Sequence, residues 1–99
     1  MATKSSVQIR GNVHVQEPKQ YNVVMHNDDF TTMDFVVSIL IEIFHKTPVT
    51  AEELMMKVHK SGRAVVGTYP YDIACTKVRQ ALNRARAENF PFRMTVEEA

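Results

Sequence analysis

Two short stretches of the sequence carry residue types that suit the binding of a cation beside an apolar group. The first is the run Asn27–Asp29, which offers one amide oxygen and two carboxylates. The second contains Met55, Val58 and His59, and positions three and four apart lie on one face of a helix. Acceptors beside an apolar wall fit a ligand that joins a cationic amine to a large apolar side chain. The N-terminus of a protein chain is such a ligand.

The α-ammonium group of a chain end has three N–H donors. Asn27, a carboxylate and a neutral His59 can accept all three of them. The first side chain of such a ligand then needs an apolar hole between the same two stretches. We expect this hole to be lined by Met33, Val36, Met55 and Val58.

Each of these residues also has a common structural explanation. Asn and Asp side chains after a strand usually bond their own backbone in a turn, which covers Asn27–Asp29. Met55 on an amphipathic helix is usually core filler. His59, close to a helix end at Gly62, is usually a cation that stabilises the helix dipole. Taken singly, these explanations are the commoner ones.

The first elements that must position the two stretches are a strand and two helices. A β-rich run predicts a strand over Tyr21–Met25. Thr31 is expected to cap the first helix, with Asp34 as its reciprocal partner. The second helix is expected to begin at Thr50 and Glu53, which have capping-box spacing, after Pro48 has stopped the first. Gly62 suits the left-handed position that ends a helix.

The remaining elements complete a β-α-α-β-α-β order. A strand is predicted over Arg63–Tyr69, a helix from Pro70 to about Asn89, and a last strand over Phe92–Val96. This order predicts an α+β sandwich, a three-stranded antiparallel sheet with three helices packed on one face. Residues 1–20 are polar and are expected to be a flexible N-terminal extension, so the core domain spans residues 21–99.

The composition excludes several classes of protein. The chain has 99 residues, of which 44% are hydrophobic and 23% charged, so there is room for one domain, and we expect a monomer. The net charge of +1 selects neither nucleic acid nor an acidic membrane. Cys75 is the one cysteine, so neither an internal disulfide nor a zinc-type cysteine pair is possible, and no metal or cofactor is expected. Without an apolar signal segment after Met1, the expected location is the cytoplasm.

Two other functions remain open at this point. An enzyme could pair His59 with a carboxylate of Asn27–Asp29, or bind a metal through His26 and that run, but a nucleophile would have to come from Cys75 or Ser61. A small RNA-binding or partner-docking domain could use the basic face of the third helix. That face carries Arg79, Asn83 and Arg86, with Arg84 and Arg93 nearby.

Four landmarks of the sequence resemble those of one known family. The run Asn27–Val36, NDDFTTMDFV, resembles the signature of the ClpS adaptor family, and Leu54–Ala64, LMMKVHKSGRA, resembles its second signature. Asp72–Val78 and Phe90–Phe92 resemble the third and fourth landmarks, in the same order. ClpS proteins are adaptors that hold the N-terminal residue of a substrate with a bulky hydrophobic side chain (Leu, Phe, Tyr or Trp). They deliver it to a ClpA- or ClpC-type AAA+ unfoldase for degradation.

The resemblance implies a role for each matching position. Asn27, Asp28 and His59 match the positions that bond the α-amino group and the first peptide unit, and Asp29 supports the electrostatics. The residues that match the hydrophobic pocket are Thr31, Thr32, Met33, Val36, Met55, Val58 and Phe92, with Met33 as the gatekeeper against β-branched residues. Asp72 and Lys77 match positions that face the N-terminal domain of the unfoldase, which also engages the segment before Tyr21.

Four positions differ from the family pattern. Thr32 stands where many members have Pro, Asp72 where Glu is common, Phe92 where Leu is frequent, and Pro70 where a hydroxyl cap is usual. None of them belongs to the amine-binding residues. The differences concern the rim of the pocket and the surface for the unfoldase.

Overall fold

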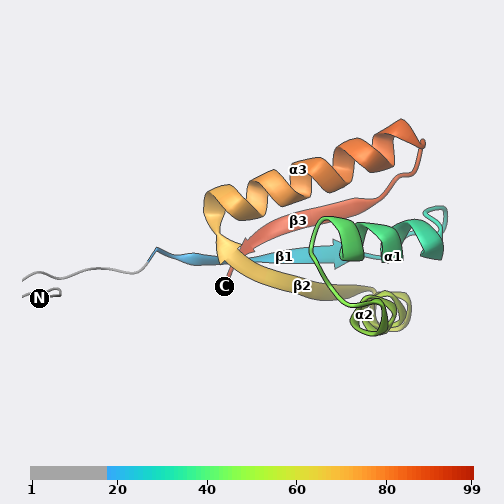
Figure 1. Ribbon diagram of the computed structural model, residues 1–99, viewed down its shortest axis with the longest axis horizontal. Coiled ribbons are helices and arrows are strands. Elements are labelled where there is room, and N and C mark those ends of the chain that lie inside the picture. The colour runs from blue at the N-terminus through green and yellow to red at the C-terminus, as the bar shows by residue number, and fades with distance from the viewer. Residues whose placement is uncertain (1–17) are drawn as a thin grey trace, which may run out of the picture.

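The computed structural model of the protein describes residues 18–99, in which strands and helices follow the predicted order (Figure 1). Residues 1–17, most of the predicted flexible extension, lie outside the described residues. The strands are β1 (Gln20–His26), β2 (Arg63–Pro70) and β3 (Arg93–Glu98). The helices are α1 (Met33–Glu42), α2 (Pro48–Ser61) and α3 (Tyr71–Ala87).

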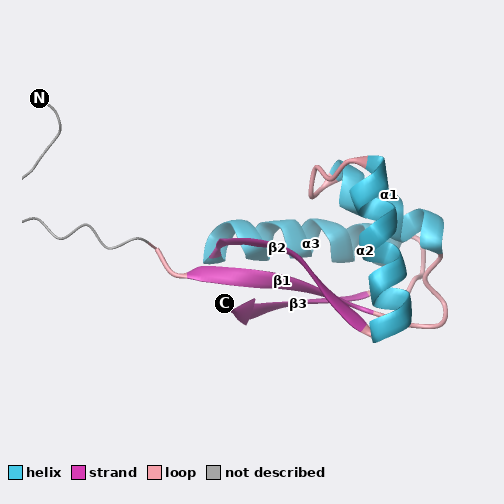
Figure 2. Ribbon diagram, turned by 90° about the horizontal axis from the view of Figure 1, so that it is seen from below, coloured by secondary structure: helices cyan, strands magenta, loops and turns pink. Residues whose placement is uncertain are grey.

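The three strands form one antiparallel sheet in the order β2-β1-β3. The helices lie to one side of it, with α3 along its length and α1 and α2 at the end where β1 stops (Figure 2). The predicted α+β sandwich is confirmed. Because β1 is the central strand and ends between the other elements, the residues that follow it emerge beside α1 and α2.

The core lies between the sheet and the helices. Val23 and Met25 of β1 and Ile39 and Leu40 of α1 have no exposed surface. From α3 the core receives mainly small side chains, and the buried residues of that helix are Ala74, Val78, Ala81 and Ala85. Small residues let α3 approach the sheet closely, so the core is filled largely by α1 and β1.

The start of α1 differs from the prediction by one residue. Thr32 caps the helix, and its Oγ1 accepts a hydrogen bond from the N–H of Phe35 at 3.2 Å. The Thr31 hydroxyl instead donates to Asp28 Oδ2 at 2.8 Å, in the loop before the helix. The predicted Thr31 cap with Asp34 as its partner is therefore wrong, and Phe35 occupies the position that a capping box needs for Glu or Gln.

The start of α2 lies earlier than predicted, because Pro48 begins this helix. Thr47 is the cap, and its Oγ1 accepts from the N–H of Thr50 at 3.2 Å. Proline suits the first helical position because that residue needs no N–H donor and its φ is already helical. The predicted cap at Thr50 is wrong. The predicted end is confirmed, since Gly62 is left-handed with φ 87° and its N–H donates to Val58 O.

The last elements are displaced by one or two residues. Helix α3 ends at Ala87, two residues before the predicted Asn89, which takes a left-handed φ of 60°. The next residue, Phe90, donates its N–H back to Ala85 O at 2.9 Å. The last strand begins at Arg93, one residue later than predicted, and the Phe92 side chain before it is buried in the core. The elements themselves agree with the prediction.

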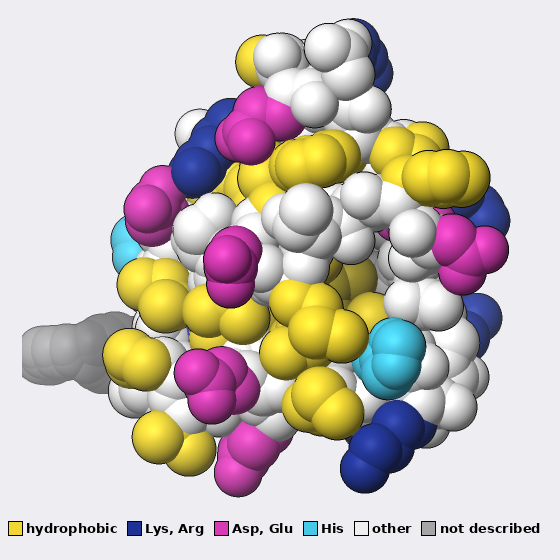
Figure 3. Space-filling view, turned by 90° about the vertical axis from the view of Figure 1, so that its right-hand side faces the viewer, with side chains coloured by type: hydrophobic (Ala, Val, Ile, Leu, Met, Phe, Trp, Pro, Cys, Tyr) yellow, Lys and Arg dark blue, Asp and Glu magenta, His cyan; other side chains and the backbone are white. Residues whose placement is uncertain are grey.

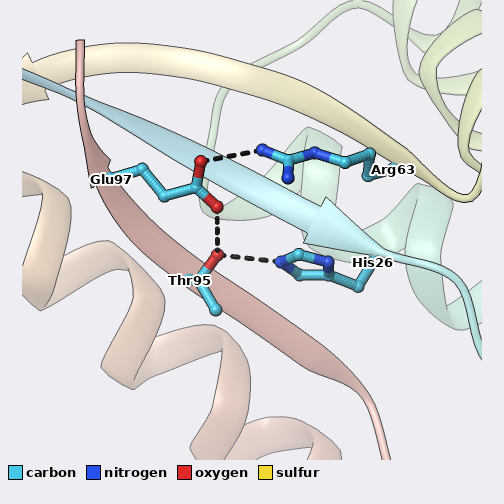
Figure 4. A network of polar contacts seen from close by, with 4 residues as sticks. All are labelled: His26, Arg63, Thr95 and Glu97. Atoms are coloured by element: carbon cyan, nitrogen blue, oxygen red, sulfur yellow. Dashed lines mark hydrogen bonds and ion pairs between the residues drawn. The ribbon is translucent and has the colours of Figure 1, made fainter.

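The face of the sheet opposite the core carries a polar network across all three strands (Figure 4). Arg63 pairs with Glu97 at 2.7 Å, and the Thr95 hydroxyl donates to the other oxygen of that carboxylate at 3.3 Å. The oxygen of Thr95 then accepts from Nε2–H of His26 at 2.8 Å. Burial lowers the pKa of His26, and the charges of Arg93 and Arg63 lower it further, against the opposite influence of Glu97.

Candidate functional site

A cavity of about 200 Å³ opens between the loop that follows β1 and one face of α2. It is lined by Asn27, Asp28, Asp29, Thr31, Met33, Val36, Met55, Val58 and His59. All four predicted amine-binding residues therefore meet at one cavity, together with every predicted wall residue except Thr32 and Phe92. Figure 3 shows the side of the molecule on which α1 and α2 lie, with hydrophobic side chains gathered around a hollow.

The loop before α1 is held by the carboxylate of Asp28. Its Oδ1 accepts from the N–H groups of Phe30 at 2.8 Å and Thr31 at 2.7 Å, and its Oδ2 accepts from the Thr31 hydroxyl. Partial burial acts to raise the pKa of Asp28, but the hydrogen bonds from Thr31 and Phe30 together outweigh burial and lower the pKa below its ordinary value. The turn is therefore built around an ionised carboxylate.

The loop should consequently lose stability in acid. A carboxyl whose pKa is lowered by folding contributes stability above about pH 4 and loses that contribution as the pH falls through its folded value. We expect Asp28→Asn to cost about 1 kcal/mol at pH 7 and progressively less as the pH falls below about 4, measured by urea unfolding. Asp29→Asn is the control, because within residues 18–99 the Asp29 side chain makes no hydrogen bond. An equal pH-dependent loss in both variants would contradict this role of Asp28.

The other polar groups of the cavity are open to a ligand. Asn27, Asp29 and His59 are exposed, and their side chains make no hydrogen bond to another residue in the part of the chain from 18 to 99. Oδ2 of Asp28 also keeps a lone pair beside its bond to Thr31. The cavity thus offers several acceptors that binding of a donor group would satisfy.

A backbone hydrogen bond joins the two walls of the cavity. The N–H of Asn27 donates to the carbonyl of Gly62 at 2.9 Å, where α2 ends. Gly62 is left-handed, so its carbonyl turns from the helix axis toward β1. Because His59 lies three residues earlier on α2, this bond fixes its position relative to Asn27. The end signal at Gly62 was readable in the sequence, but its partner across the fold was not.

The apolar wall is the outer edge of the core. Val36 and Val58 are 7% and 5% exposed, whereas Met33 is 47% exposed at the first residue of α1. Buried valines make a fixed floor, and an exposed methionine makes an adjustable rim. The cavity therefore combines a rigid apolar base with an opening that a single flexible side chain narrows.

Two residues predicted for the pocket wall do not line the cavity. Thr32 is exposed and caps α1. Phe92 is 6% exposed and packs edge-to-face against Phe35, with ring centroids 5.9 Å apart. The phenylalanine ring is larger than the leucine frequent at this position, and it fills space in the core. Thr32 therefore stabilises the start of α1, and Phe92 stabilises the core.

The two residues predicted to face an unfoldase line a separate, open cavity of about 490 Å³ between the end of α1 and the start of α3. Asp72 is exposed there. The ammonium of Lys77 donates to Ile43 O at 2.9 Å and lies 5.7 Å from the ring centroid of Phe44. Lys77 therefore closes the C-terminal end of α1, a structural contact that the sequence did not reveal.

The residues weighed for an enzyme or a metal site are dispersed, whereas Arg79, Asn83 and Arg86 of the basic face line one cavity beside α3. Within residues 18–99, no three His, Cys, Asp or Glu side chains lie close enough together to hold a metal ion. His26, proposed as a ligand, bonds Thr95 instead. On α3, Arg84 pairs with Glu42 at 2.6 Å. None of the helices in the described part of the chain has the length and hydrophobicity that crossing a membrane requires.

Comparison with known proteins places these features in one family. The family described as "ATP-dependent Clp protease adaptor protein ClpS" matches residues 16–95. The ClpS of Treponema denticola is 56% identical over 82 residues, covering 83% of this chain and 81% of that protein. The ClpS of Acetivibrio thermocellus is 45% identical over 97 residues, covering 98% of each chain.

A solved structure has the same fold. It is Agrobacterium tumefaciens ClpS2 bound to L-phenylalaninamide, which superposes with a TM-score of 0.81 at 36% identity and covers 84% of this chain and 100% of that one. The sequence matches and the shared fold agree with each other. The chain described here belongs to the ClpS family of Clp protease adaptors, which are adaptor proteins and not enzymes.

Proposed function

We propose that this adaptor binds the free α-amino group and the first side chain of a substrate N-terminus in the cavity between the β1–α1 loop and α2. The observation that carries the proposal is the convergence of Asn27, Asp28 and His59 on an apolar hole of about 200 Å³. That volume lies below the roughly 300–1,000 Å³ of pockets for drug-sized ligands. It suits one amino-acid side chain.

The ligand of the A. tumefaciens relative supports this assignment. L-phenylalaninamide has a free α-amino group, a bulky aromatic side chain and a carboxamide in place of the next peptide unit. These are the three parts that a cavity with acceptors at one end and an apolar floor would recognise. In this chain we assign the ammonium to Asn27, the carboxylates of Asp28 and Asp29 and a neutral His59, and the side chain to the wall formed by Met33, Val36, Met55 and Val58.

The affinity expected from these contacts is moderate. Burial of a Leu or Phe side chain contributes about 1.5–3 kcal/mol. Each hydrogen bond to a charged group contributes about 1.5–3 kcal/mol. After the cost of ordering the peptide, about −8 kcal/mol remains, which corresponds to a micromolar dissociation constant. Such an affinity lets an adaptor release its cargo.

The proposal is tested with a fluorescent peptide that begins with leucine. We expect Asn27→Ala and His59→Ala each to weaken binding about tenfold or more, because each removes an acceptor from the ammonium. Lys60→Ala on the same helix and Asn83→Ala on α3 are matched controls, exposed and outside the cavity. Binding by both site variants at the parental affinity, in fluorescence anisotropy, would show that the peptide binds elsewhere.

Met33 is proposed as the gatekeeper that excludes β-branched first residues. Its side chain lines the cavity and is 47% exposed, so its removal widens the opening and leaves the core intact. Met33→Ala is expected to raise the affinity for peptides that begin with valine or isoleucine about tenfold, with a smaller effect on leucine. Met56→Ala, a half-exposed methionine of α2 outside the cavity, is the control. Continued rejection of valine by Met33→Ala would place the gate at another residue.

The proposed partner for delivery is the N-terminal domain of a ClpA- or ClpC-type unfoldase, which would contact the open cavity between α1 and α3. Asp72 offers an exposed charge there, and Lys77 shapes the surface by fixing the end of α1. No residue of this cavity belongs to the amine-binding cavity. Substrate and unfoldase would therefore occupy different sides of the adaptor at the same time.

A further inference from the structure

A third cavity, of about 360 Å³, lies between α3 and β3 and shares no residue with the two described above. It forms an open groove. Its floor is apolar and comes from Cys75, Val78 and Leu82 of α3 and Val96 of β3. Arg79 and Arg86 lie along its rim. The proposed peptide cavity gives this groove no role, but the groove includes Arg79, Asn83 and Arg86, the basic face that the sequence offered for docking a partner.

The groove follows one flank of α3. Cys75, Arg79, Leu82 and Arg86 are separated by four, three and four residues, a spacing that places them on one face of the helix. The side of α3 that faces the core is a different stripe, formed by small residues such as Ala74 and Ala81. The flank of α3 at the groove therefore alternates apolar and arginine side chains. Leu82 and Val96 are half-buried against the core and also line the groove.

The two arginines of the rim are available for a ligand. Of the other basic residues on this helix, Lys77 is bonded to Ile43 O and Arg84 is paired with Glu42. Within residues 18–99, no carboxylate forms an ion pair with Arg79 or Arg86, and no acidic residue lines the groove. Arg86 is oriented by a hydrogen bond to Asn83 Oδ1 at 2.9 Å, which leaves most of its N–H donors free.

Charge and shape together define the ligand. The rim arginines are seven residues apart, which corresponds to about 10 Å along a helix, and Leu82 lies between them. We infer that the groove binds an acidic amphipathic segment of a partner protein, with an apolar anchor that sits near Leu82 and Val96. Two carboxylates about 10 Å apart would pair with Arg79 and Arg86. Two guanidinium groups beside an apolar floor are a poor match for RNA, which needs a longer basic track.

The test uses a fluorescein-labelled peptide with the pattern Glu-x-x-Leu-x-x-x-Glu and an acetylated N-terminus, so that it cannot present a free amine. We expect a dissociation constant of tens of micromolar for the parent protein and at least a tenfold loss when both glutamates become glutamine. The variant R79E/R86E should also lose at least tenfold. The control K57E/K60E, with the same change of net charge on α2, should stay within about twofold.

Two further measurements make the result decisive. A peptide that begins with leucine should bind R79E/R86E at the parental affinity, so failure of the groove and failure of the amine cavity are distinguishable. If R79E/R86E does not fold, R79Q/R86Q replaces it, and chemical-shift changes in the parent should centre on Leu82 and Val96. Absence of binding at 1 mM peptide, equal binding of the glutamine peptide, or preferential binding of a single-stranded RNA with steep salt dependence would each overturn the inference.

Discussion

A peptide that begins with leucine is expected to lose at least a hundredfold of its affinity when its α-amino group is acetylated. Acetylation removes the positive charge and two of the three N–H donors. The acceptors of Asn27, Asp28 and His59 would then be covered by the peptide without donors, and each unsatisfied buried polar group costs about 1–3 kcal/mol. The acetyl group itself also needs space at the polar end of a cavity of about 200 Å³.

The measurement is a competition experiment in which free and acetylated peptides displace the same labelled ligand. A peptide amidated at its C-terminus is the control, because that change lies outside the cavity and removes a charge of the opposite sign. We expect it to compete like the parent peptide. Equal competition by the acetylated peptide would mean that the cavity recognises the side chain alone, and the assignment of the amine to Asn27 and His59 would fail.

Gly62→Val is expected to destabilise the protein by about 1–3 kcal/mol and to weaken binding of the leucine peptide. Gly62 has φ 87°, a conformation that β-branched residues rarely adopt. A Cβ atom at this position meets no other atom of residues 18–99 within 4 Å, so the cost comes from backbone strain. The carbonyl that accepts from Asn27 belongs to the same residue, so a shift of its backbone also separates the two walls of the cavity.

Gly62→Asn is the matched variant, because asparagine tolerates the left-handed conformation better than other residues with a side chain. It should retain most of the stability and of the peptide affinity. Urea unfolding gives the first quantity, and titration of the folded protein gives the second. If Gly62→Val unfolded at the same urea concentration as the parent, the left-handed conformation at position 62 would not require glycine.

The sequence predicted the elements of this fold because their signals are local. The β-rich run of β1 and the glycine that ends α2 each depend on neighbouring residues. The errors arose where a polar side chain had two partners within reach. Spacing alone favoured Thr31 as the helix cap, but in the structure its hydroxyl bonds Asp28 and the neighbouring Thr32 caps α1.

The residues that line the cavity were predictable from the sequence, but the tertiary contacts that hold them in place were not. Residue types and family spacing identified the residues that line the cavity. Tertiary contacts decide the roles of Phe92 and Lys77, one of which packs against Phe35 and the other against Phe44. No pattern within a single segment encodes such contacts. The same holds for the bond between Asn27 and Gly62, which joins the loop after β1 to the end of α2.

The network of His26, Arg63, Thr95 and Glu97 affects how readily the protein associates with itself at high concentration. It lies on a sheet face that no helix of the described chain covers, and its ion pair joins Arg63 and Glu97 of the two outer strands across that face. Stacking of two such sheets would strip water from Arg63 and Glu97 without giving either a better partner. Large exposed apolar patches favour association, so we expect the charged pair on this face to disfavour stacking of two adaptor molecules through their sheets.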